Sequence, residues 1–72
     1  MTAARAVDIA RERALQEGLP WQEPASAVRM RPTRQGQRLW WVRAPGNVIG
    51  RSVSVVVDAT TGEVLQTGVA LR

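Results

Sequence analysis

The chain of 72 residues contains no cysteine, histidine, lysine, tyrosine or phenylalanine. Without cysteine there is neither a disulfide nor a thiolate metal site, and without histidine the commonest general base and metal ligand is missing. The six carboxylates are the only candidate acids and bases. No phosphate-binding glycine loop, nucleophile elbow or zinc-ligand spacing is present. We therefore expect a protein that is not an enzyme, with no catalytic residue, cofactor or metal.

Long apolar runs are also missing from the sequence. A membrane-spanning helix needs about 20 apolar residues, and the first residues lack the apolar stretch of a signal peptide. We expect no membrane association and a cytoplasmic protein as the sequence stands, or an extracytoplasmic one if the sequence is part of a longer chain. This length predicts one domain, residues 1–72, that buries only about 60% of its unfolded surface.

The beginning of the chain predicts an amphipathic helix over about residues 3–17. Thr2 is a suitable N-cap, the segment contains neither glycine nor proline, and Gly18 suits the position after the helix. Apolar residues recur with the helical period on one face: Ala3, Ala6, Val7, Ile9, Ala10 and Ala14. Because this stripe is mostly alanine, we expect the helix to lie close to the surface that it covers.

Four later segments have the composition of β-strands. They span about residues 26–31, 38–44, 52–58 and 63–71, and the second is expected to break at residues 45–47. Val28 and Met30 should point inward, Gly68 should mark a β-bulge, and Trp21 should close one end of the core. Because every connection is short, sequential strands should be neighbours. The predicted fold is α+β: one N-terminal amphipathic helix packed on a three- or four-stranded antiparallel β-sheet.

The connection between the last two strands carries the clearest turn signal. Asp58 can bond the turn backbone through its carboxylate, and Gly62 can adopt the positive φ that a bulged hairpin loop needs. Asp58 and Glu63 could also approach each other as a carboxylate pair, but a turn-stabilising aspartate and a strand-start glutamate explain them more simply. We predict that Asp58 and Gly62 have a structural role.

Positive charge is concentrated in the middle of the chain, where residues 25–57 contain six arginines and no acid. The candidate partner-binding residues are Arg29, Arg31, Arg34, Arg38, Arg43 and Trp41. A period of two places Arg29 and Arg31 on one strand face and puts Arg38 and Arg43 on opposite faces of the next strand. Such a surface can steer an acidic protein partner. It can also bind nucleic acid with Trp40 or Trp41 stacking on bases, or simply be a solvated face.

Several segments together resemble a PepSY-type domain, a cystatin-like family that joins an N-terminal helix to an antiparallel sheet. They are Ala6-Val7-Asp8-Ile9-Ala10, Gly18-Leu19, Trp40-Trp41-Val42 and Val55-Val56-Val57-Asp58-Ala59-Thr60-Thr61-Gly62-Glu63-Val64-Leu65. The last of them matches the family's terminal hairpin, V-D-x-x-T-G-x-V. The pattern is also similar to that of small bacterial immunity proteins. The resemblance implies a non-catalytic protein concerned with peptidase inhibition, propeptides or extracytoplasmic sensing.

The sequence thus predicts a non-catalytic protein-interaction module that binds an acidic protein partner through an arginine-rich sheet. A small nucleic-acid-binding protein and a structural domain without independent activity are the alternatives. A weak homodimer is also expected, because the uncovered sheet face retains Leu39, Trp41 or Val56 and the edge strands have free backbone groups.

Overall fold

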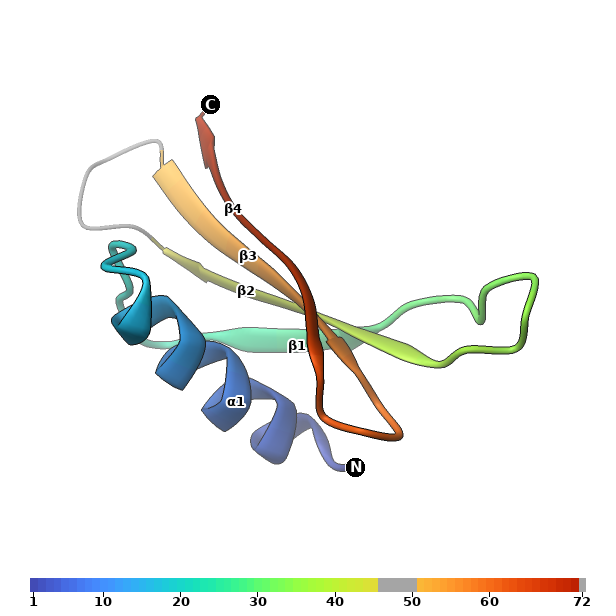
Figure 1. Ribbon diagram of the computed structural model, residues 1–72. Helices are drawn as coiled ribbons and strands as arrows, with labels where there is room; N and C mark the ends of the chain where they lie inside the picture. The colour runs from blue at the N-terminus through green and yellow to red at the C-terminus, as the bar shows by residue number, and fades with distance from the viewer. Residues whose placement is uncertain (46–50, 72) are drawn as a thin grey trace.

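The computed structural model describes residues 1–45 and 51–71 and has the predicted α+β architecture (Figure 1). One N-terminal helix covers one face of a four-stranded antiparallel sheet with the strand order β1-β2-β3-β4. The elements are α1 (Ala3–Gln16), β1 (Ser26–Arg29), β2 (Leu39–Pro45), β3 (Arg51–Asp58) and β4 (Val64–Leu71). Pro45 is the last residue of β2, and residues 46 and 47 of the expected break lie outside the described residues.

Both ends of α1 are capped as the sequence predicts. The Thr2 hydroxyl accepts a hydrogen bond from the Arg5 N–H at 3.2 Å. At the other end, Gly18 has φ 69°, its N–H donates to the Leu15 carbonyl, and the Leu19 N–H donates to the Ala14 carbonyl. These two bonds form a Schellman motif, and the positive φ explains why glycine follows this helix.

The core lies between the alanine stripe of α1 and the valines of the sheet. Its fully buried members are Ala6, Ala10, Ala14, Val42, Val53, Val55 and Val57, with Trp40 nearly buried beside them. Ala3 was expected in the stripe but is exposed, because helical periodicity gives the angle of a residue and not where the covered sheet ends. Trp21 packs against this core as expected.

The predicted facing of β1 is wrong. Val28 and Met30 are exposed, whereas Ala27 packs against the core and Arg29 lies over the Trp40 ring. Ala27 is small enough to let α1 approach. Arg29 is paired with Trp40 on the same face, and the Trp40 ring lies beneath its guanidinium. The strand also ends at Arg29, earlier than residue 31.

The predicted bulge position is wrong as well. Gly68 pairs regularly with Ser54, whereas the register shifts next to the hairpin, where Val56 pairs with Gln66 and Val57 with Val64. The extra residue is therefore Leu65. A bulge at this position fits the geometry of a hairpin loop with a positive-φ glycine at its end.

Candidate functional site

The arginines of α1 differ from those of the sheet in their partners. The Arg11 guanidinium binds the carboxylates of Asp8 and Glu23, and Arg13 binds Glu17 at 3.3 Å. The hydrogen bond to Glu23, and after it the bond to Asp8, raises the pKa of Arg11 above its ordinary value. Within the described part of the chain, none of the arginines between residues 25 and 57 forms an ion pair with a carboxylate. Their charge is therefore not neutralised by a neighbouring acid.

Two adjacent tryptophans lie on opposite faces of the sheet, and each has one of these arginines stacked on it. Trp40 and Trp41 follow each other in β2 and point to opposite faces of the sheet, so Trp40 is 8% exposed and Trp41 is 38% exposed. Each ring carries one guanidinium: Arg29 lies 5.3 Å from the Trp40 centroid, and Arg43 lies 5.4 Å from that of Trp41. Both distances are within the range of a cation–π interaction.

The sheet face away from α1 is called the open face below. Register and alternation assign to it Ser26, Val28, Met30, Leu39, Trp41, Arg43, Ser54, Val56 and Gln66. Val28, Trp41 and Val56 lie side by side across three strands, because Trp41 pairs with both of the others. Val28 is 55% exposed and Met30 is 41% exposed. A shallow hollow of about 350 Å³ lies on this face against Trp41, Met30 and Val56.

Carboxylates occur only at the hairpin end of the open face within residues 1–45 and 51–71. Alternation places two of them on this side: Asp58 at the end of β3, whose side chain is buried, and the exposed Glu63, which precedes β4 and stands opposite Asp58. The Asp58 carboxylate accepts hydrogen bonds from the Gln37 amide and from the Thr60 and Thr61 N–H groups. Away from the hairpin, in the part of the open face around Trp41, the exposed charge is that of Arg43.

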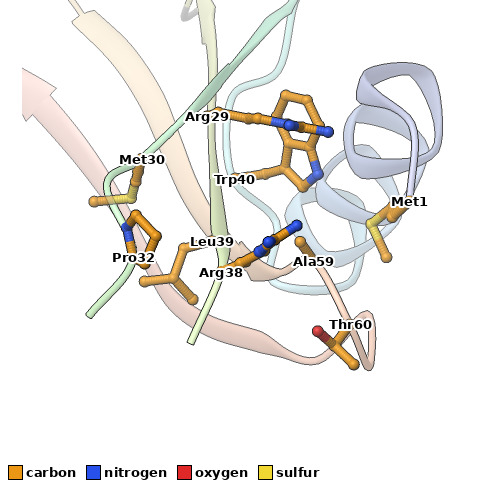
Figure 2. Close-up of a pocket in the computed structure, with 9 residues that line it drawn as sticks. All are labelled: Met1, Arg29, Met30, Pro32, Arg38, Leu39, Trp40, Ala59 and Thr60. Atoms are coloured by element: carbon orange, nitrogen blue, oxygen red, sulfur yellow. The ribbon is translucent and has the colours of Figure 1, made fainter. Parts of the chain in front are cut away.

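The remaining candidate arginines do not join Arg43 on one surface. Arg31 and Arg34 are exposed on the β1–β2 connection, which extends away from the helix in Figure 1. Arg31 follows the end of β1, so the expected shared strand face with Arg29 does not form. Arg38 and Arg29 both lie near Trp40 (Figure 2). This is the side of β2 opposite to Arg43, so Arg38 and Arg43 lie on opposite faces as expected.

The hairpin residues have the predicted structural role. Gly62 has φ 78°, and its N–H donates to the Asp58 carbonyl at 2.9 Å. The hydrogen bonds from Gln37 and from the turn N–H groups lower the pKa of Asp58 below its ordinary value of 3.8. The Asp58 carboxylate is thus a charged turn acceptor, and Asp58 meets Glu63 only through the backbone, where its N–H donates to the Glu63 carbonyl at 2.8 Å.

Sequence reasoning missed three features of these surfaces. The first is the place of Val28 and Met30 on the open face, and the second is the pairing of each tryptophan with an arginine. The third is a second hollow, at the end of the sheet, which Trp40 lines together with Arg29 and Arg38. The Arg–Trp pairs could have been anticipated only from the β1–β2 register, which the composition of a four-residue strand does not specify.

Neither a metal cluster nor a membrane helix is found in the described part of the chain. Within residues 1–45 and 51–71, no group of three or more aspartate or glutamate side chains is placed to hold a metal ion. None of the helical structure over these residues has the length and apolar character that crossing a membrane requires.

Comparison with protein families, with curated proteins and with solved structures finds no match for this chain. The resemblance to PepSY-type domains therefore stays a prediction. Weak self-association also stays a prediction, with β1 and β4 as the two edge strands of the sheet.

Proposed function

We propose that this chain is a non-catalytic protein-interaction module, similar to PepSY-type inhibitory or immunity domains, whose open face binds an acidic protein partner. The observation that carries the proposal is the composition of that face. It combines the half-exposed Trp41, the guanidinium of Arg43 stacked on it, and exposed apolar neighbours.

This combination matches the residues that contribute most to protein–protein binding. Tryptophan and arginine are enriched at the centres of interfaces, where a ring is buried and a guanidinium forms directed hydrogen bonds. Trp41 has Val28 and Val56 directly beside it in the sheet register. A partner that covers Trp41 would therefore also cover a continuous apolar strip around it.

The charge of the open face favours an acidic partner over a neutral one. Arg43 has no carboxylate partner among the described residues, so its guanidinium is free to bind a carboxylate of another molecule. The acids of α1 and of its C-cap lie on the side of the sheet opposite the open face, where Asp8 is bonded to Arg11 and Glu17 to Arg13. This separation of charge orients an approaching acidic surface toward the sheet.

A displayed library of random peptides, selected against the immobilised protein at near-physiological salt, tests the proposal. We expect the enriched peptides to combine aspartate or glutamate with aromatic or aliphatic residues. Their affinity should fall at least about tenfold in Trp41→Ser and in Arg43→Gln, since each variant removes a central contact. Arg5→Gln is the matched control, because it removes the same charge from an exposed position on α1.

Two outcomes would overturn the proposal. One is a selection without enrichment of acidic peptides, or with enriched peptides that bind Trp41→Ser as tightly as the parent. The other is saturable binding of labelled single- or double-stranded oligonucleotides that weakens steeply with salt and is lost in Arg43→Gln. The second result would assign the open face to nucleic acid.

A further inference from the structure

A second surface with unneutralised positive charge lies at the end of the sheet, between the β1–β2 connection and the 58–63 hairpin. Here a hollow of about 440 Å³ is lined by Arg29, Arg38, Trp40, Met30, Leu39 and Thr60, among others. Figure 2 shows the Arg29 side chain across the Trp40 ring and the Arg38 side chain beside that ring, both extending toward the same side. The hollow meets the open face at Met30 and Leu39, but its two arginines and Trp40 lie on the side of the sheet that α1 covers.

The strand register explains why the two arginines line the same hollow. Arg29 pairs directly with Trp40 across β1 and β2, and Arg38 precedes Trp40 by two residues, so all three share one face. The Arg38 backbone is held in place because its carbonyl accepts a hydrogen bond from the Ala59 N–H at 2.9 Å. The Trp40 ring supports the Arg29 guanidinium by the cation–π contact.

The donors that remain in the hollow suit one carboxylate. The Ala59 N–H is used by Arg38, and the Thr60 N–H donates to Asp58 at 2.7 Å. A bound anion would therefore be held by the two guanidinium groups and the Thr60 hydroxyl. A guanidinium fork matches the two oxygens of a carboxylate. Many phosphate sites add free backbone N–H groups to such forks, and the two N–H groups named here are occupied.

The other walls of the hollow are apolar. Met30 and Leu39 lie on one side of it, and Met1, which precedes the N-cap of α1, lies on the other (Figure 2). The nearby Asp58 carboxylate is already bonded to Gln37 and to the turn, so it does not neutralise the arginines directly. A ligand with one carboxylate next to an apolar group would match both parts of this lining.

We propose that this hollow binds an aspartate or glutamate side chain of the protein partner, presented next to an apolar residue in an extended segment. This inference rests on the proposed function and names a second contact point for the same acidic partner. The open face would hold the partner's apolar surface, while Arg29 and Arg38 would fix the position of one acidic residue.

The experiment is a titration of ¹⁵N-labelled protein followed by NMR, with acetyl-Leu-Glu-Leu-amide as the probe. The chain has three tryptophans, so three indole N–H signals report separately on the surfaces. We expect saturable shifts of the Trp40 indole and of the Arg29 and Arg38 Nε–H signals. Acetyl-Leu-Gln-Leu-amide should bind at least about tenfold more weakly, because it cannot accept charge-assisted hydrogen bonds as a carboxylate does.

Arginine variants locate the carboxylate. Arg29→Gln and Arg38→Gln should each weaken binding of the glutamate peptide at least about fivefold, and Arg29→Lys should also weaken it, because lysine lacks the planar fork. Arg51→Gln is the matched control, because Arg51 is exposed and begins β3, at the end of that strand away from the hollow. Its affinity for the peptide at the Trp40 signal should stay within about twofold of the parent. A dispersed amide spectrum shows that each variant is folded.

Three results would overturn this inference: no saturable shift of the Trp40 indole, an equal response to the glutamine peptide, or an equal loss of binding in Arg51→Gln. A further arm uses phenyl phosphate, and binding tighter than that of the glutamate peptide would replace the carboxylate by a phosphate ligand. If Trp41 responds to acidic peptides and Trp40 does not, the hollow is excluded while the proposed function stands. If the hollow binds the peptide but the library selection yields no acidic sequences, the proposed function of the open face fails alone.

Discussion

Replacement of Gly62 by alanine tests the hairpin geometry directly. Gly62 has φ 78°, and an L-residue in this region is destabilised by about 1–2 kcal/mol. The loss of glycine also stiffens the unfolded chain, which offsets about 0.4–1 kcal/mol of that cost. A Cβ at residue 62 would lie 3.3 Å from Ile9 Cδ1 and 3.4 Å from Met1 Cε. Both atoms are at the ends of flexible side chains that can shift, so the crowding adds little. Gly62→Ala should therefore cost about 1–1.5 kcal/mol in total.

Gly36→Ala is the matched control for the contribution of the backbone. Gly36 has φ 80°, and a Cβ there would meet no atom within 4 Å. Its replacement should therefore cost about 1 kcal/mol or less, from the φ strain alone. The difference between the two alanine variants measures the crowding of the residue 62 Cβ against Ile9 and Met1.

Asparagine separates φ strain from crowding, because asparagine is larger than alanine but tolerates positive φ better. Gly62→Asn should cost less than Gly62→Ala, whereas the β-branched Gly62→Val should cost more than about 2 kcal/mol. Urea unfolding followed by tryptophan fluorescence gives these free energies, with the m-value as a check on two-state behaviour. If asparagine costs more than alanine, crowding dominates and the argument from φ is wrong. A valine variant as stable as the parent would refute the turn geometry itself.

Two further predictions concern stability. Because hydrogen bonds lower the pKa of Asp58 in the folded state, its charge stabilises the fold above its ordinary pKa of 3.8, and this stabilisation is lost as pH falls through the folded pKa. Asp58→Asn should therefore flatten the fall of urea midpoints with acid, with Glu12→Gln as a control for net charge; an unchanged acid dependence would contradict the assignment. Ala10 is fully buried under the sheet, so Ala10→Leu should cost about 1–3 kcal/mol in the same urea assay, whereas leucine at the exposed Ala4 should change stability by less than about 0.5 kcal/mol. Equal effects at both positions would show that α1 does not lie close to the sheet.

The features that the sequence predicted well depend on few neighbouring atoms. Thr2, Gly18 and Gly62 act through bonds to residues no more than five positions away, so their local sequence is sufficient. The valines at alternate positions of β3 need only one buried face, and all three at Val53, Val55 and Val57 are buried. The order of the strands followed from short connections, which leave little choice of neighbour.

The facing of β1 was not predictable because it depends on residues far along the chain. Val28 is more apolar than Arg29, and local composition therefore favours Val28 inside. The actual choice is made by β2, which pairs Arg29 with Trp40 and Val28 with Trp41. Trp40 faces α1, so Arg29 must face it too, with its guanidinium over the ring. A strand of four residues has too little hydrophobic pattern to oppose this pairing.

The same pairing determines how the candidate site is organised. In the sequence, the arginines between residues 25 and 57 form one acid-free segment, which suggested one basic surface. In the fold, Trp40 and Trp41 occupy opposite faces of β2, and each takes an arginine with it, Arg29 on one side and Arg43 on the other. Arg29 and Arg43 stack on different tryptophans and do not contact each other's ring, so the effects of Arg29→Gln and Arg43→Gln on binding of a whole partner protein should add. A single continuous patch would instead couple the two substitutions, and a double-mutant cycle on binding of such a partner distinguishes the two arrangements.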